Sequence, residues 1–139
     1  MSRVVVDASL ALAWCFPDEG SDYADQVLVA LKGHLIAVPP VWSLEVANAI
    51  LVGERRKRLK QPEIQRFLDL VDGLSIVQDT ETVGENLSGV LPVARGCNLS
   101  AYDAAYLELA IRIAAPLATL DLRLRRAATQ AEIRMFLTV

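Results

Sequence analysis

The chain has 139 residues and a mass of 15.2 kDa, the size of a single domain (1–139) that can bury a core without a disulfide or a structural metal. Its hydrophobic content of 53% excludes an intrinsically disordered chain, and its longest weakly charged stretch is interrupted by prolines and by Glu45, which excludes a membrane span. The net charge of −3 excludes a uniformly basic nucleic-acid-binding protein. Cys15 and Cys97 lack the spacing of metal ligands, and we expect them to be free thiols of a cytoplasmic protein.

Short apolar segments typical of strands alternate with longer segments that have helical spacing. Strands are expected at 4–6, 35–39, 75–78, 117–120 and 135–139, and helices at 20–32, 42–59, 62–72, 81–96, 100–115 and 121–130. Pro92 is expected to break the fourth of these helices, and Ser100 to cap the fifth. The alternation predicts an α/β fold, a three-layer α/β/α sandwich around a mainly parallel sheet of about five strands.

Four acidic residues stand apart from other charges. Each is the only charged residue in a long segment of the chain, with His34 counted as neutral: Asp7 in 4–17, Glu45 in 33–53, Asp103 in 96–107 and Asp121 in 113–122. Asp7 and Asp121 each follow an expected strand directly, whereas Glu45 and Asp103 are expected in the first turns of two helices. Because parallel strands end at the same edge of a sheet, where the following helices begin, we expect the four acids to converge there.

A purely structural role is the alternative for each acid taken alone. Asp121 has the position of a helix N-cap, and Asp103 lies three residues after Ser100, as a capping-box acid does. Taken together, the four carboxylates would repel one another, by about 4 kcal/mol for a pair about 4 Å apart at an effective dielectric constant of about 20. A hard divalent cation offsets this repulsion, so the set predicts a site for Mg²⁺, with Mn²⁺ as a substitute.

A magnesium site made of oxygen ligands favours phosphodiester hydrolysis, in which the metal polarises the phosphate and activates a water molecule. A carboxylate outside the inner coordination shell then accepts the proton of that water. Two basic groups are expected to bind the nucleic-acid backbone, although a solvated helix face is the alternative for both; they include Arg55, Arg56 and Arg58 in the first group and Arg123 and Arg126 in the second.

Other reaction types are excluded by residues that the chain lacks. His34 is the only histidine, which excludes paired-histidine ribonuclease chemistry and a zinc site made of several histidines. A small phosphatase or a receiver-like signalling domain would carry a second acid next to the one that follows the first strand. Here that segment is Asp7-Ala8-Ser9, so both classes are disfavoured.

Four segments together carry a family resemblance: VVVDAS at 4–9, LEVANAI at 44–50, LSAYDAAYLELA at 99–110 and PLATLDLRL at 116–124. In this order and at this total length they resemble the PIN-domain family, and more narrowly the VapC-type toxins of bacterial and archaeal toxin–antitoxin pairs. The resemblance covers essentially the whole chain. It implies a parallel-sheet sandwich with Mg²⁺- or Mn²⁺-dependent endoribonuclease activity on a structured RNA such as tRNA, a homodimer, and inhibition by a small cognate antitoxin.

The resemblance also assigns roles to individual residues. Asp7, Glu45, Asp103 and Asp121 match the acids that hold the metal and carry catalysis in the family. Ser9 and Thr119 match small hydroxyl positions beside the first and last acids, where they hold a carboxylate or a metal-bound water; a turn or cap role is the alternative. Because Leu122-Arg123 lacks the further acid of some related nucleases, we expect one firmly bound ion and a second bound only with RNA.

Two alternatives remain open at this point. The whole chain is either an active nuclease or a catalytically silent PIN-like domain that binds RNA or a partner. The apolar segment at 10–16, which includes Trp14, is either part of the core or a groove for an antitoxin helix.

Overall fold

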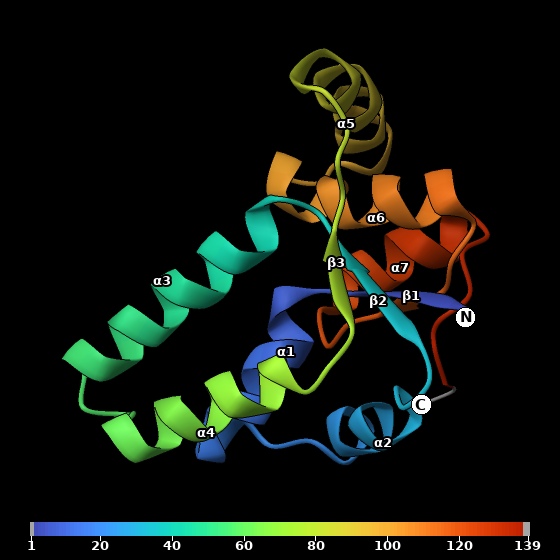
Figure 1. Ribbon diagram of the computed structural model, residues 1–139. Coiled ribbons are helices and arrows are strands. Elements are labelled where there is room, and N and C mark those ends of the chain that lie inside the picture. The colour runs from blue at the N-terminus through green and yellow to red at the C-terminus, as the bar shows by residue number, and fades with distance from the viewer. Residues whose placement is uncertain (1, 138–139) are drawn as a thin grey trace.

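The computed structural model describes residues 2–137, and these form one parallel sheet with helices around it (Figure 1). The strand order is β3-β2-β1-β4, with β1 at Arg3–Val6, β2 at Leu35–Val38, β3 at Ile76–Gln78 and β4 at Leu117–Ala118. The helices are α1 (Ala8–Cys15), η1 (Pro17–Glu19, a 3-10 turn), α2 (Asp22–Ala30), α3 (Val41–Arg55), α4 (Gln61–Asp72), α5 (Val83–Cys97), α6 (Ala101–Ile113) and α7 (Leu122–Gln130). The predicted α/β sandwich with a parallel sheet is confirmed.

Strand β1 lies at the centre of the sheet and of the core. It pairs with β2 on one side and β4 on the other, so that Val5 lies opposite both Ala37 and Leu117. Val4, Val5 and Val6 are at most 1% exposed. A parallel strand that is covered on both faces needs an unbroken apolar sequence, and the three β-branched valines provide it.

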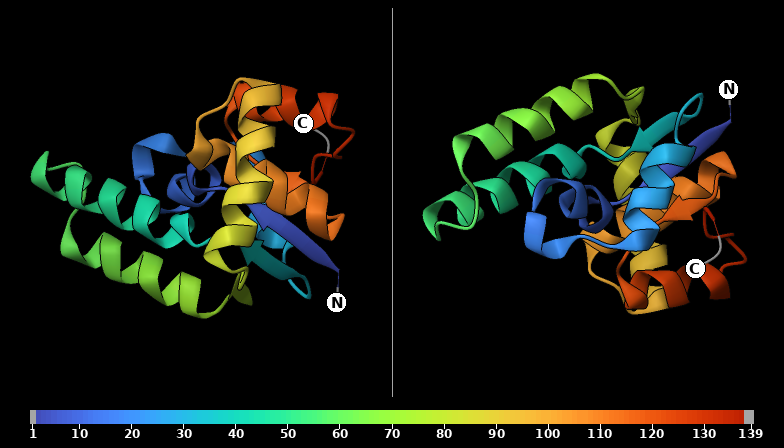
Figure 2. Two further views of the ribbon diagram at one scale, coloured as in Figure 1. Left: turned by 90° about the horizontal axis from the view of Figure 1, so that it is seen from above. Right: turned by 90° about the horizontal axis from the view of Figure 1, so that it is seen from below.

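The helices divide into groups that pack on different parts of the sheet. Helix α6 packs against β1 and β4 and carries α5 on its outer side, whereas α1 packs against α2, α3 and α4. Helices α3 and α4 form an antiparallel pair that projects away from the sheet (Figure 2). The basic run that begins at Arg55 lies at the turn between these two helices.

Three local predictions differ from the structure. Pro92 does not break α5, because it and Ser88 are both exposed, so that water can bind the Ser88 carbonyl that proline leaves without a donor. The expected fifth strand is reduced to one parallel bridge between Met135 and Leu117; the left-handed backbone of Glu132 and Leu137 prevents a longer extended run, and residues 138–139 lie outside the described range. The segment 8–15, to which the sequence assigned no element, is helix α1.

A cluster of ion pairs joins the end of β3 to α6. Arg112 pairs with Asp79 at 2.7 Å, with Glu81 at 3.0 Å and with Glu108 at 2.8 Å. The Glu108–Arg112 pair is the favourable i,i+4 arrangement that the helix sequence predicts. Because Asp79 and Glu81 both lie in the segment between β3 and α5, their pairs with Arg112 hold that segment against α6.

Both cysteines are free, as predicted, with Cys15 buried and Cys97 half-buried. Within residues 2–137, no helix has both the length and the apolar character that crossing a bilayer requires.

Close packing at Gly53 gives a test of the α1–α3 contact. A Cβ atom at position 53 would lie 2.6 Å from the Phe16 ring, whereas one at Gly84 in α5 would meet open space. We expect Gly53→Ala to lower the free energy of unfolding by about 1–3 kcal/mol, because the clash exceeds the helix preference of alanine. Gly84→Ala, the matched control, should raise it by about 0.5–1 kcal/mol. Urea denaturation of both variants measures this, and a Gly53→Ala variant as stable as wild type would contradict the packing described.

Candidate active site

Asp7 and Asp121 lie at the same edge of the sheet because they follow neighbouring parallel strands. Asp7 follows β1, and its backbone N–H donates to the Ala118 carbonyl of β4 at 3.2 Å. Each of the two acids is the N-cap of the helix that comes next: Asp7 accepts from Leu10 N–H at 3.1 Å, and Asp121 accepts from the N–H groups of the first turn of α7. The N-cap role predicted for Asp121 therefore exists, and it coincides with a place at this edge.

Two hydroxyl groups hold the Asp7 carboxylate. Ser9 Oγ donates to it at 2.8 Å, and Thr119 Oγ1 donates to Oδ2 at 2.5 Å. Both hydroxyl oxygens accept a backbone N–H in turn, Ser9 from Leu120 at 3.1 Å and Thr119 from Asp121 at 2.9 Å. The backbone donors leave the hydroxyl hydrogens free to point at Asp7. Of the alternatives for Ser9 and Thr119, these contacts match the one in which they hold a carboxylate.

Asp103 and Glu45 come from two helices beside this edge. Asp103 is in the first turn of α6, where the Ser100 hydroxyl caps the helix by accepting the Asp103 N–H at 3.2 Å. Glu45 is in the second turn of α3 and not in the first, because the helix starts at Val41 directly after Pro40, whose restricted φ favours that start. Both side chains are half-buried.

The charges of the four acids act on one another in sequence. Burial, the largest cause, raises the pKa of Asp7 to about 6 against the lowering effect of its hydrogen bonds, and the charge of Asp121 adds to the rise. Burial and then the charge of Asp121 raise the pKa of Asp103. Burial and, to a lesser extent, the charge of Asp103 raise the pKa of Glu45. The acids thus form a continuous series from Asp7 through Asp121 and Asp103 to Glu45.

This series has an excess of negative charge. The ion pairs formed within residues 2–137 involve none of the four acids. The positive charge that acts on them is that of Arg123, which lowers the pKa of Asp103. Across the same residues, no three acidic, histidine or cysteine side chains are gathered closely enough to bind one metal ion together. The donor set is nevertheless chemically suited to Mg²⁺ or Mn²⁺, because these ions prefer carboxylate oxygens and keep several waters.

Tyr106 belongs to this site, although the sequence analysis did not single it out. It lies on α6 one turn after Asp103, and its hydroxyl donates a short hydrogen bond to Glu45 Oε1. A buried tyrosine hydroxyl requires a partner, so the one phenol within the buried run 104–110 was the available signal. The partner itself comes from α3, 61 positions away in the chain, and no spacing rule indicates it.

The predicted basic residues fall into two places. Arg123 and Arg126 line a polar pocket of about 210 Å³ beside the C-terminal end of α5, where Arg123 donates to the Asn98 carbonyl at 3.3 Å. Arg55 and Arg56 are exposed at the turn between α3 and α4, about 15 Å along the helix from Glu45.

Arg58 lies in the same basic run but is engaged within the fold. It pairs with Asp18 at 3.0 Å and with Glu19 at 2.6 Å, and its guanidinium lies 4.5 Å from the centre of the Phe16 ring. These contacts fix the α3–α4 turn to η1, so Arg58 is less accessible to a nucleic acid than its neighbours.

Trp14 has the position that the core alternative predicts. It is half-buried, and its indole N–H donates to the Ala24 carbonyl at 2.9 Å, which joins α1 to α2. An apolar groove lies instead between α3 and α4. It has a volume of about 390 Å³, and its lining includes Val46, Leu51, Phe67 and Leu68.

Comparison with known proteins bears on this arrangement. The family model of the PIN domain matches residues 4–130. The chain belongs to the PIN-domain family. It is 31% identical over 123 residues to Ribonuclease VapC3 of Pyrobaculum aerophilum, a match that covers 88% of this chain and 92% of that protein. The VapC-type resemblance given by the four sequence segments is thereby confirmed.

Two solved structures share the fold. The crystal structure of PAE2754 from Pyrobaculum aerophilum has a TM-score of 0.67 at 24% identity. The match covers 91% of this chain and 79% of the PAE2754 chain. The crystal structure of VapBC2 from Rickettsia felis bound to a DNA fragment from their promoter has a TM-score of 0.66 at 16% identity and covers 96% and 97% of the two chains. PIN-like architecture therefore extends over nearly the whole chain.

The raised pKa of Asp7 gives a test of its burial. In the folded protein this pKa is about 6, above its ordinary value of 3.8, so the folded state takes up the proton first as the pH falls. The stability that Asp7 contributes is therefore greatest below pH 4 and is lost as the pH rises through about 6. In metal-free buffer, we expect the gain in unfolding free energy from Asp7→Asn to grow from about 0.5 kcal/mol at pH 4 to about 3 kcal/mol at pH 7.

Urea denaturation at several pH values measures this difference. Asp25→Asn, an exposed acid on α2, is the control and should show no such trend. A stability difference for Asp7→Asn that is independent of pH would contradict the strong burial of this carboxyl.

Proposed function

We propose that the chain, as a single nuclease domain over 1–139, is a metal-dependent endoribonuclease of the VapC toxin type that hydrolyses a structured RNA such as tRNA in the cytoplasm. The observation that carries the proposal is the series of four acids without a cationic partner, which begins at the buried Asp7. Its place in a PIN-domain chain that is 31% identical to a ribonuclease supports the same conclusion.

In this proposal the acids hold one Mg²⁺ or Mn²⁺ firmly, and a second ion binds only with RNA. Asp7, Asp103, Asp121 and Glu45 are the residues that would hold the metal. When bound, the metal supplies Lewis-acid polarisation of the phosphate and lowers the pKa of a water molecule. Asp7 is kept in one orientation by Ser9 and Thr119, which pre-organises its carboxylate.

Glu45 is the acid best placed to accept a proton. It is half-buried at the end of the series, and its pKa is raised by burial and by the charge of Asp103. A carboxylate with a raised pKa is a better proton acceptor near neutral pH than an ordinary glutamate. Its place on α3, outside the Asp7–Asp121 pair, keeps it separate from the acids that lie deepest.

The RNA backbone requires positive charge beside so acidic a site. Arg123 is close enough to influence Asp103, and Arg126 lines the same pocket, so these two residues are proposed to bind the phosphates next to the scissile bond. Arg55 and Arg56 at the tip of the α3–α4 pair are proposed to bind RNA farther away. Arg58, which is paired with Asp18 and Glu19, contributes less.

Cleavage of labelled RNA by the purified protein tests the activity. With Mg²⁺ or Mn²⁺ we expect cleavage, and we expect Asp7→Asn and Asp103→Asn to reduce kcat/KM by at least about 100-fold, because each removes a carboxylate that would hold the metal, and the metal would stabilise the negative charge of the transition state. A chelator should abolish cleavage. Asp25→Asn is the control for an acid outside the site.

Two outcomes would contradict the proposal. Cleavage that persists in chelator, or full activity of either site variant, would exclude the metal-dependent mechanism. If the wild-type protein binds RNA but never cleaves it, the chain is the catalytically silent relative instead.

A cognate antitoxin is the proposed inhibitor, and the groove between α3 and α4 is its proposed binding site. The groove is lined almost entirely by apolar side chains, and Leu51 and Leu68 are each 45% exposed, as suits the apolar face of an amphipathic helix. Arg55 and Arg56 at its open end would attract acidic residues of that helix. A partner seated there would also cover two residues proposed to bind RNA, which links binding to inhibition.

A second copy of the chain is the other proposed partner. Helix α5 exposes Val83, Leu87 and Leu91 in one line, with Glu85 near its first end and Arg95 near its last. Two α5 helices packed antiparallel about a two-fold axis would pair these leucines and bring each Glu85 towards the Arg95 end of the other copy. This self-complementary charge pattern supports a homodimer through α5.

A charged substitution in the α3–α4 groove tests antitoxin binding without altering a buried core residue. We expect Leu68→Glu to reduce co-purification with the small protein encoded next to this chain by at least about 10-fold, because a carboxylate would be buried against an apolar helix. Val29→Glu on α2, a more exposed apolar site elsewhere, should have no effect. Growth arrest that the neighbouring protein still relieves in cells expressing Leu68→Glu would place the antitoxin elsewhere.

A further inference from the structure

We propose that Tyr106 is a positioning residue of the acidic site: its buried hydroxyl holds the Glu45 carboxylate of α3 against α6. The inference concerns a side chain that fills the core with its ring and reaches the site with its oxygen. Its expected effect on metal binding and RNA cleavage rests on the proposed function, whereas the hydrogen bond itself does not.

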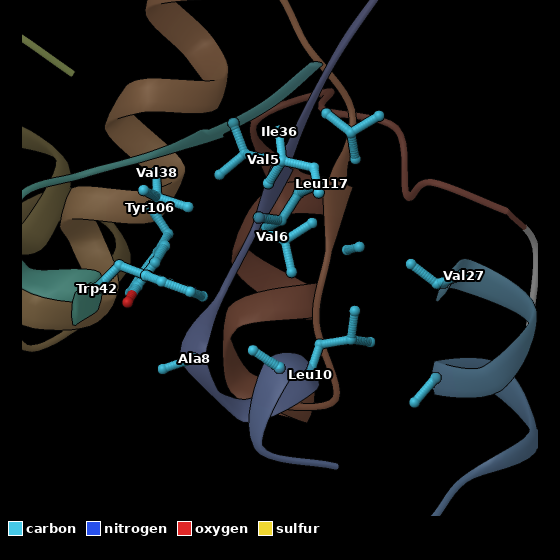
Figure 3. Close-up of a cluster of buried hydrophobic side chains, with 14 of the residues drawn as sticks. Val5, Val6, Ala8, Leu10, Val27, Ile36, Val38, Trp42, Tyr106 and Leu117 are labelled. Atoms are coloured by element: carbon cyan, nitrogen blue, oxygen red, sulfur yellow. The ribbon is translucent and has the colours of Figure 1, made fainter. Parts of the chain in front are cut away.

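The ring of Tyr106 is part of the hydrophobic core. Tyr106 is 2% exposed and belongs to the same cluster as Trp42 and Val38 (Figure 3). A phenylalanine ring would fill this space equally well. Packing alone therefore does not explain the hydroxyl group, whose desolvation costs free energy unless it finds a partner.

The hydroxyl meets a group from another helix, because it donates to Glu45 Oε1 on α3. Burial, the hydrogen bond to Glu45 and the negative charges of Glu45 and Asp7 all raise the pKa of Tyr106, so that the phenol keeps its proton and remains a donor. One hydrogen bond thus connects α6 to α3 across 61 positions of the chain.

This connection matters because Glu45 differs from Asp7 and Asp121 in how it is held. Asp7 and Asp121 accept backbone N–H groups as helix N-caps, and these bonds fix their carboxylates. Glu45 lies in the second turn of α3, where no N-cap bond is possible, and a glutamate side chain has three rotatable bonds. The bond from Tyr106 occupies one of its two oxygens and leaves the other for the site.

The test compares four proteins: wild type, Tyr106→Phe, Glu45→Gln and the double variant. Binding of Mn²⁺ is followed by electron paramagnetic resonance, and RNA cleavage is followed by kcat and KM. For Tyr106→Phe we expect an apparent Kd for Mn²⁺ about 10-fold higher than that of wild type and a kcat about 10-fold lower, with KM within about 2-fold. Because Tyr106 acts through Glu45, the second substitution should add no further loss in the Glu45→Gln background.

Tyr23→Phe is the matched control. Its hydroxyl is also part of a buried residue, and it donates to the Phe136 carbonyl at 2.6 Å and not to one of the four acids. We expect both tyrosine variants to lower Tm by no more than about 5 °C, and we expect only Tyr106→Phe to change Mn²⁺ binding. Equal effects of the two variants on Mn²⁺ binding would show a general loss of packing and would overturn the inference.

The outcomes separate this inference from the proposed function. Unchanged Mn²⁺ binding and kcat in Tyr106→Phe, or losses that add to those of Glu45→Gln, would overturn the positioning role while leaving the nuclease intact. If the wild-type protein binds Mn²⁺ with the expected dependence on Tyr106 but cleaves no RNA, the positioning role stands and the nuclease proposal fails. If the wild-type protein binds no Mn²⁺ and cleaves no RNA, both fail.

Discussion

The burial of the Asp7 carboxylate at the end of the central strand is the constraint on which the site depends. An ionised carboxylate costs several kcal/mol to bury without a cation, and here the offset comes from the hydroxyls of Ser9 and Thr119 and from the Leu10 N–H. Thr119 reaches Asp7 only because β1 and β4 are adjacent and parallel. The sheet order, the turn after β4 and the first turn of α1 are therefore tied together by one side chain.

From this fixed end, the negative charge extends outward over three more elements. Asp121, Asp103 and Glu45 are successively linked by their charges, and Arg123 opposes them only in part. Such an arrangement destabilises the metal-free protein at neutral pH. A carboxyl pKa that is higher in the folded state means that folding disfavours the ionised form of that carboxyl. Fold stability is provided elsewhere, by the valines of β1 and by the Arg112 ion pairs.

The edge position of Asp7 and Asp121 could be predicted from the sequence because each directly follows an apolar strand, and the direction of parallel strands then assigns both acids to one edge. Their role as the acids of an active site stays a prediction. The features that the sequence did not predict depend on solvent exposure, on local backbone conformation or on pairing between residues that are distant in the chain. Pro92 stays inside α5 because it faces water, and the run after Arg134 is interrupted by the left-handed residue Leu137. The contact of Tyr106 with the site could not be predicted because its partner, Glu45, lies on a separate helix, and local spacing carries no information about such a pair.

The two ends of the acidic series differ in rigidity, and this difference bears on inhibition. The Asp7 end is anchored by backbone N–H groups through Ser9 and Thr119, so little short of unfolding would displace it. The Glu45 end belongs to α3, half of a helical pair that projects from the sheet (Figure 2). Trp42 and Val46, on either side of Glu45 in the sequence, line the apolar groove. A partner helix in that groove would press on the very turn that carries Glu45, so it would act on an acid that is not anchored as a helix N-cap as well as cover the arginines at the tip.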